Sequence, residues 1–293
     1  MNKLLPIIII LIFLATLPAF AASAIAGTQT TALDTNNSYL DGKFSVSAGF
    51  NGNHMRYKEF DGLDILDEDR GNSGGFYLGL GFKSNNYIEN IMAKPYVEAY
   101  YRESSAAVKY IGRASDGITT TDFSFNEQSK IRNFGLKIGG YTAFTDKGEI
   151  SGYFDLGQRS WYRGKNEVIN NVLSYSEKYY WTYLGLGIAA NFLFLPRFST
   201  GIDAEWMFTP SSAKMRSNLY EGGTFGLTNV YGYEIKMPLK YYILKNLSLD
   251  LTPYFTYWKI GKSDLVQIKG NYYYEPDSKT FIEGVLAGFT YTI

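Results

Sequence analysis

Strict alternation of apolar and polar residues is the feature that most constrains the fold of this chain. The segment L-S-L-D-L-T (247–252) places a leucine at every second position, with Asp250 among the residues between them. Successive side chains of a β-strand point to opposite faces of its sheet. One face of this strand is therefore apolar and the other polar. The same alternation recurs at 76–83, 134–144, 154–159, 202–208, 234–241 and 285–293.

Two kinds of β protein fit this alternation. In a soluble sandwich the apolar faces pack against a second sheet, whereas in a membrane barrel they face lipid and the polar faces fill the lumen. The segments reach the roughly ten residues that a tilted membrane strand needs, and their polar faces carry charges in mid-strand. Aromatic residues gather near strand ends, as an interfacial girdle requires. These aromatic groups are Tyr100-Tyr101, Trp161-Tyr162, Tyr179 to Trp181 and Tyr254 to Trp258. We therefore predict an all-β, transmembrane, antiparallel up-and-down barrel.

The first residues have the organisation of a secretory signal. Residues 1–24 contain one early cation, Lys3, an apolar run over 4–17 and the small residues Ala19 and Ala21 around Phe20. This pattern is typical of a cleaved signal peptide, because the apolar run is short for a bilayer span. Residues 25–42 show no alternation and are interpreted as a periplasmic leader. The barrel is expected over 43–293, in the outer membrane of the cell.

The composition excludes cysteine chemistry and gives no sign of nucleic-acid binding. The chain has no cysteine, so neither disulfides nor thiolate chemistry contribute. Its 28 basic and 28 acidic residues balance, and they still nearly balance once Lys3 is removed with the signal. No net field would recruit nucleic acid.

The spacing of the polar breaks sets the number of strands. Short connections at 84–90, 145–149, 195–197 and 244–246 alternate with longer ones at 61–75, 113–128, 164–174, 209–225 and 264–277. Short periplasmic turns and long outer loops are typical of outer-membrane barrels, and an even number of strands leaves both ends of the barrel in the periplasm. The predicted strands, about ten, span 43–60, 76–84, 91–112, 129–144, 150–163, 175–194, 198–209, 226–243, 247–263 and 278–293.

With these features the chain resembles the Gram-negative outer-membrane β-barrel proteins. Its last residues, F-T-Y-T-I, are similar to the C-terminal signal that those proteins present to the barrel insertion machinery, although the chain ends in Ile293 where the pattern has Phe. Length and strand number are also similar to the omptin proteases, whose resemblance implies an Asp pair and an Asp–His pair at the extracellular mouth. The single histidine, His54, lies in N-G-N-H-M-R on the apolar face of its strand, so no Asp–His pair can be carried over. No G-x-S-x-G motif supports a serine hydrolase.

The inward parity of the strands predicts a charge network in the lumen. Because isolated charges in a narrow interior would each cost several kcal/mol, we expect them to pair. About eight strands make a barrel filled by side chains, so a barrel of about ten with long polar side chains has little open cross-section. The predicted network consists of Lys94, Glu98, Arg102, Lys137, Asp155, Arg159, Asp203, Glu205, Glu234, Lys236, Lys240 and Asp250.

The first long connection is acidic. Asp64, Asp67 and Asp69 lie close enough in sequence to offer oxygen ligands to Ca²⁺, but their spacing matches no EF-hand loop. A solvated acidic loop is the favoured interpretation, and no metal or cofactor is predicted.

These observations predict a non-enzymatic, porin-like or structural envelope protein with surface loops accessible to a ligand. Its expected partners are outer-membrane lipid, lipopolysaccharide and the insertion machinery, with Lys259 placed to meet a lipopolysaccharide phosphate. Two alternatives stay open, a membrane-embedded hydrolase of the omptin or lipid A-modifying kind and a narrow selective channel.

Overall fold

The computed structural model describes residues 42–88, 92–115, 120–164, 168–169, 172–173, 175–211, 213–218 and 222–293. The predicted signal peptide and all but the last residue of the predicted leader lie outside these ranges. Within the described residues, no helix has the length and apolar character needed to cross a membrane.

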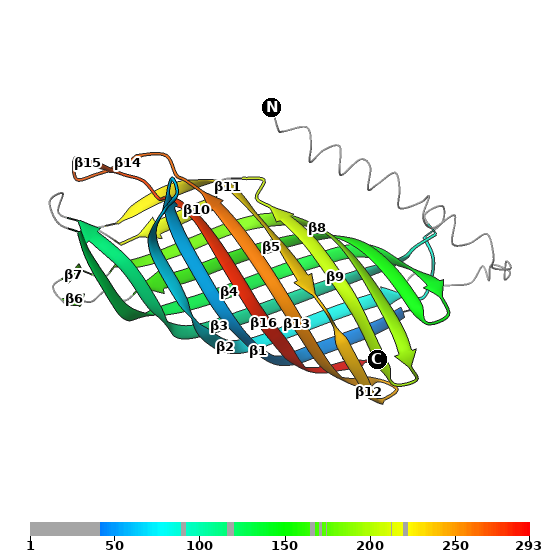
Figure 1. Cartoon of the computed structure of the whole chain (residues 1–293). Coiled ribbons are helices and arrows are strands. Elements are labelled where there is room, and N and C mark those ends of the chain that lie inside the picture. The colour runs from blue at the N-terminus through cyan, green and yellow to red at the C-terminus, as the bar shows by residue number, and fades with distance from the viewer. Residues whose placement is uncertain are drawn as a thin grey trace.

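Antiparallel strands close into one barrel, in which β1 pairs with β2 on one side and with β16 on the other (Figure 1). Two small hairpins stand outside the ring, β6 (Val168–Ile169) with β7 (Val172–Leu173) and β14 (Val266–Ile268) with β15 (Asn271–Tyr273). The strands of the ring are β1 (Gly42–Asp61), β2 (Asp64–Ser84), β3 (Lys94–Ser115), β4 (Thr120–Thr145), β5 (Gly148–Gly164), β8 (Ser176–Leu195), β9 (Phe198–Phe208), β10 (Ala213–Ser217), β11 (Gly223–Lys236), β12 (Leu239–Leu244), β13 (Leu247–Gly261) and β16 (Asp277–Thr292).

Two places in the wall are each occupied by two strand segments. β9 and β10 both pair with β8 and β11, and β11 and β12 both pair with β9 and β13. Pro210 and Pro238 lie in the two breaks, where a residue without an N–H cannot continue the hydrogen-bond ladder. The twelve segments of the ring therefore occupy ten strand positions, and the predicted antiparallel barrel of about ten strands is confirmed.

The wall is taller than the sequence indicated. Residues 61–75 and 113–128 were expected to form long loops, but β2 already begins at Asp64, β3 continues to Ser115 and β4 begins at Thr120. A two-residue turn at Gly62, whose φ is +62°, connects β1 to β2. These segments are polar because their outer face meets water, not because they leave the sheet. The expectation of long loops at these two places was wrong for that reason.

An apolar belt covers the outside of one half of the barrel. This half ends at the short turns and the C-terminus, which lie at the same end of the barrel in Figure 1. Its side chains are on the outer face and remain exposed although they are large and apolar, as lipid-facing residues of a membrane barrel are. Leu80 is 61% exposed, for example. Belt residues include Phe44, Phe50, Phe76, Leu78, Leu80, Phe134, Ile138, Phe154, Leu156, Leu184, Ile188, Phe192, Ile202, Ile235, Leu249, Leu251 and Phe289.

Above the belt the two faces exchange character. The outer face becomes polar, while the inner face packs into a continuous hydrophobic core, which we call the plug. Every strand position except that of β2 contributes to it. The plug consists of Met55, Tyr57, Val108, Ile131, Trp161, Tyr179, Trp181, Tyr183, Met207, Ala213, Met215, Phe225, Leu227, Val230, Tyr254, Trp258, Ile260 and Ile282.

Part of the predicted aromatic girdle belongs to the plug instead. Trp161, Tyr179, Trp181 and Trp258 were expected at the lipid interface, but each lies on the inner face and is less than 5% exposed. Trp181 and Trp258 meet edge to face, with ring centroids 5.1 Å apart. Because water surrounds the wall at this height, large apolar side chains are buried only by turning inward.

Candidate functional site

The lower lumen holds ion pairs between residues that the sequence placed on the inner face. Arg102 Nη2 lies 2.6 Å from Glu234 Oε2. Lys236 Nζ lies 3.1 Å from both Glu234 Oε1 and Asp203 Oδ2. Thr256 also donates its hydroxyl to Glu234. Four of the predicted charges therefore form one connected group that crosses the barrel from β3 to β9.

A second group continues from Asp203. Lys137 Nζ lies 3.3 Å from Glu205 Oε2 and 3.6 Å from Asp203 Oδ2. The Lys137 side chain is buried, with only 6% of its surface exposed. Tyr153 links the same carboxylates by hydrogen bonds. Asp155, opposite Lys137 on β5, accepts a hydrogen bond from the Tyr100 hydroxyl at 2.6 Å.

The other predicted residues are less tightly connected. Asp250 lies 3.8 Å from Lys240 Nζ and accepts hydrogen bonds from Ser248 and Thr290. Arg159 donates to Asn133 at 2.9 Å and lies beside the Trp181 and Trp258 rings. The remaining two are near the lower rim, where Lys94 lies over the Tyr87 ring and Glu98 is exposed.

A cluster of six buried carboxylates, which we call the mouth cluster, lies above the belt around one guanidinium, that of Arg163. Arg163 is 4% exposed and lies at the upper end of β5. Five of the carboxylates lie within ion-pair distance of its nitrogens: Glu59 at 2.7 Å, Asp69 at 3.1 Å, Asp67 at 3.3 Å, Glu127 at 3.5 Å and Glu177 at 3.6 Å. The sixth, Glu275, lies beside Glu59 and Glu177.

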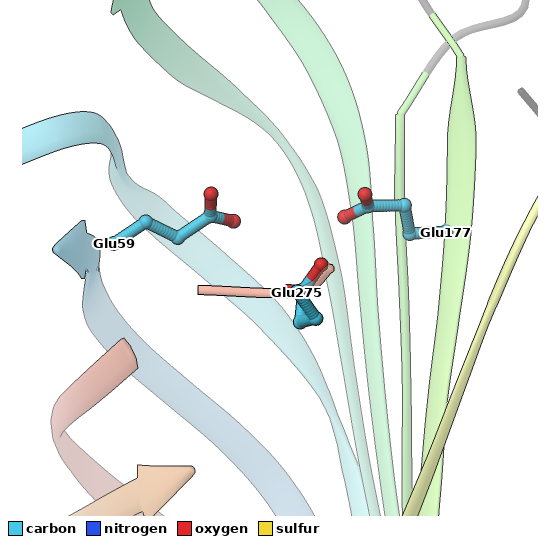
Figure 2. Close-up of side chains that lie close together, drawn as sticks. All are labelled: Glu59, Glu177 and Glu275. Carbon is cyan, nitrogen blue, oxygen red and sulfur yellow. The ribbon is translucent and has the colours of Figure 1, made fainter. Parts of the chain in front are cut away.

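Three glutamates of this cluster converge from different parts of the chain (Figure 2). Glu59 comes from β1, Glu177 from β8 and Glu275 from the segment between β15 and β16, and one oxygen of each lies within 4.8 Å of the others. Ser263 fixes Glu275 in place, because its hydroxyl accepts from the Glu275 N–H at 2.8 Å and its own N–H donates to the Glu275 carbonyl at 2.9 Å.

Two tyrosines supply hydroxyl donors to these glutamates. Tyr57 donates to Glu59 at 2.7 Å. Tyr179 lies 2.9 Å from Glu177 Oε2 and 2.5 Å from Glu275 Oε1, so its single proton serves only one of them at a time. Burial, and next the charges of Glu177 and Glu59, raise the pKa of Glu275 well above its ordinary value.

The sequence singled out only two members of this cluster. Asp67 and Asp69 face the interior from β2 and are buried, whereas Asp64 is exposed at the turn. The expected solvated acidic loop was therefore wrong for Asp67 and Asp69. Glu127 was missed because it fell in a segment interpreted as a loop. A taller wall with unchanged parity would have placed Glu127 on the inner face, where the parity of the predicted strand 150–163 already puts Arg163.

His54 lies on the outer face of β1. It is exposed, and its Nδ1 lies 2.8 Å from Asn72 Oδ1. Because the chain has a single histidine and it points away from the lumen, the mouth cluster contains no Asp–His pair.

Comparison with known proteins shows which solved structures have a similar fold. No family model and no curated protein matches the chain. Among solved structures, the outer membrane protease OmpT from Escherichia coli superposes with a TM-score of 0.62 at 10% identity, over 90% of this chain and all of that one. The outer membrane protein OprG from Pseudomonas aeruginosa superposes with a TM-score of only 0.33 at 12% identity, over 86% of this chain and 96% of that one. This chain therefore has the fold of a Gram-negative outer-membrane β-barrel protein.

Proposed function

We propose that the protein is a non-enzymatic outer-membrane barrel with a closed lumen, which acts through its outer wall and its extracellular rim. The plug is the observation that supports this proposal. It places buried apolar side chains across the barrel at one height, where a conducting pore would need a hydrated, polar wall.

The ion pairs of Arg102, Lys137 and Lys236 cross the interior below the plug. A cavity of about 10 Å³, room for about one water molecule, lies where the plug meets the lower lumen. Arg102, Arg159, Ile131 and Ile282 contribute to its lining. Free passage of metabolites is not expected through such an interior.

Reconstitution into planar bilayers tests the closed lumen. The purified barrel should leave the bilayer closed even at high protein load. Discrete single-channel steps from the unmodified protein would contradict the proposal and favour the narrow-channel alternative. A variant with the plug thinned, Trp161→Gly with Trp258→Gly, serves as the positive control for detecting current through this barrel.

Lipopolysaccharide is the partner that we propose for the outer wall. Above the belt, like-charged residues lie directly opposite one another on neighbouring strands, an arrangement that is destabilising unless an anion lies between them. Glu68 neutralises part of the positive charge, because its Oε2 lies 3.1 Å from Lys58 Nζ. The two rows are Lys259, Lys279 and Lys58 across β13, β16 and β1, and Arg56, Arg70 and Lys109 across β1, β2 and β3.

The phosphate groups of lipid A would neutralise such rows. We expect the barrel to bind phosphorylated lipopolysaccharide more tightly than the dephosphorylated form, and added salt to reduce the difference. Lys259→Gln with Lys279→Gln should weaken that binding, while Lys214→Gln, an exposed lysine outside the rows, should not. Equal binding of the two lipid forms would contradict this partner.

A hydrolase is the second candidate, and the carboxylates of the mouth cluster are the observation that favours it. Hydrolysis of peptides or of lipid A by the purified, refolded barrel, lost in an Asp69→Asn variant, would support it. Absence of activity on both substrate classes would favour the non-enzymatic function.

A further inference from the structure

The three converging glutamates have the spacing of ligands around one cation. Calcium binds oxygen at about 2.4 Å, so two ligands on opposite sides of the ion are about 4.8 Å apart. One oxygen from each of Glu59, Glu177 and Glu275 lies within 4.8 Å of the other two (Figure 2). A single ion between them would reach all three.

The charge of the mouth cluster points the same way. Six buried carboxylates face one guanidinium, and Glu275 is the one that Arg163 does not reach within ion-pair distance. Buried carboxylates are costly unless they are paired, protonated or bound to a metal. Arg163 compensates one negative charge, and a divalent cation beside Glu275 would compensate two more.

Unused oxygens in the cluster provide a separate indication of a ligand. Asp67 is 7% exposed and lies directly opposite Glu59 across the β1–β2 ladder, with both side chains directed inward. Its Oδ2 accepts hydrogen bonds from Arg163 and Tyr110, but its Oδ1 has no hydrogen-bond partner among the residues that the structure describes. The same holds for Asp69 Oδ1, on a side chain with no exposed surface. Buried acceptors are rarely left without a partner.

We propose that the mouth cluster binds one Ca²⁺ between Glu59, Glu177 and Glu275. The ion joins β1 and β8 to the segment that carries Glu275, and so fastens that segment over the plug. The site is independent of the closed lumen and of lipid binding, since none of its ligands lies in the belt or on the outer wall.

Terbium luminescence tests the site directly, because Tb³⁺ takes Ca²⁺ positions and is excited by nearby aromatic rings. Tyr179 contacts two of the proposed ligands and stacks on Trp161 with ring centroids 5.1 Å apart. Titrating TbCl₃ into the folded barrel in detergent should give saturable luminescence with one site per chain. Ca²⁺ should displace the Tb³⁺ at lower concentration than Mg²⁺, which requires shorter bonds and a stricter geometry.

Substitutions decide whether that site is the proposed one. Glu275→Gln should lower the Ca²⁺ affinity by at least about tenfold, since affinity follows the number of charged ligands. The matched control is Asp264→Asn, an exposed carboxylate elsewhere in the connection between β13 and β16, which should leave the affinity unchanged. Heat-modifiability on gels establishes that each variant is folded, and Ca²⁺ should also raise the unfolding temperature of the unmodified barrel.

Three results would overturn the proposal. They are the absence of saturable luminescence, an affinity that Glu275→Gln leaves unchanged, and an unfolding temperature that Ca²⁺ does not raise. The last would mean that protons alone neutralise the cluster.

Discussion

The belt and the wall above it share the same alternation of side chains, but the apolar residues face outward in the belt and inward above it. On β8 the even-numbered residues face outward throughout, yet they are Leu184, Ile188 and Phe192 in the belt and become Lys178, Tyr180 and Thr182 above it. The inward residues change in the reverse direction, from Gly185 and Gly187 to Tyr179 and Trp181. The parity of a strand therefore fixes which residues share a face, and the surrounding solvent decides which face is apolar.

Inward glycines leave room for aromatic side chains in both halves. In the belt half a β-carbon on Gly187 would lie 2.1 Å from the Tyr153 ring. The inward glycine thus leaves room for the tyrosine, whose hydroxyl passes over β8 to Asp203 and Glu205 on β9. In the plug, a β-carbon on Gly232 would lie 2.7 Å from the Trp258 ring, so this glycine leaves room for a tryptophan.

Removing a plug side chain should have the largest effect on stability. Trp258→Ala should lower the free energy of unfolding by about 3–5 kcal/mol, because the substitution would leave a cavity that is enclosed by the other side chains of the plug. Trp206→Ala, at a tryptophan on the outer face, is the matched control and should cost clearly less. Urea unfolding followed by tryptophan fluorescence measures both, and equal losses would mean that the plug is not a packed core.

Breaking a lumen ion pair comes next. Arg102→Met should cost about 3 kcal/mol, toward the lower end for a buried pair because the Arg102 side chain keeps 13% exposure. Much of this cost comes from the unpaired Glu234. Adding Glu234→Met to the same protein should therefore recover part of the loss, and a fully additive double variant would show that the two residues do not interact.

A charge introduced on the outer face should distinguish the belt from the wall above it. Ile138→Arg, in the belt, should cost about 2–4 kcal/mol. Gln128→Arg lies on the same face of the same strand above the belt, and should change stability by less than about 0.5 kcal/mol. Similar costs at the two positions would contradict the placement of the belt.

Asp250→Leu should have the smallest effect of the four, about 1–3 kcal/mol, since it leaves Ser248 and Thr290 without their acceptor. The loss should appear as a lower temperature for the heat-induced shift on gels. An unchanged heat-modifiability would show that Asp250 contributes nothing to the barrel.

The fold was predictable because alternation is local. Parity alone placed Arg102, Lys137 and Glu234 on the same inner surface, and the polar breaks gave the ten strand positions. The height of the wall was not predictable in this way. A polar outer face in water, as around Arg70 and Lys109, has the composition of a loop. Parity, by contrast, already puts Trp161 on the inner face with Asp155 and Arg159.

The mouth cluster depends on contacts that sequence separation hides. The sequence singled out Asp67 and Asp69 together with Asp64 as an acidic group. Glu177 and Glu275 join the cluster only through the closure of the ring and the fixing of the Glu275 segment at Ser263. Neither the register nor that hydrogen bond has a signal in the sequence.

Accessibility along β8 tests the exchange of faces most directly. The chain has no native cysteine, so single cysteines can be introduced over 177–192 and spin-labelled in lipid vesicles. We predict access to oxygen at the even positions 184–192, access to a water-soluble nickel complex at the even positions 178–182, and shielding from both at positions 179, 181 and 183. Access of the nickel complex to positions 179 and 181 would contradict the account, because the interior above the belt would then contain water where the structure places the plug.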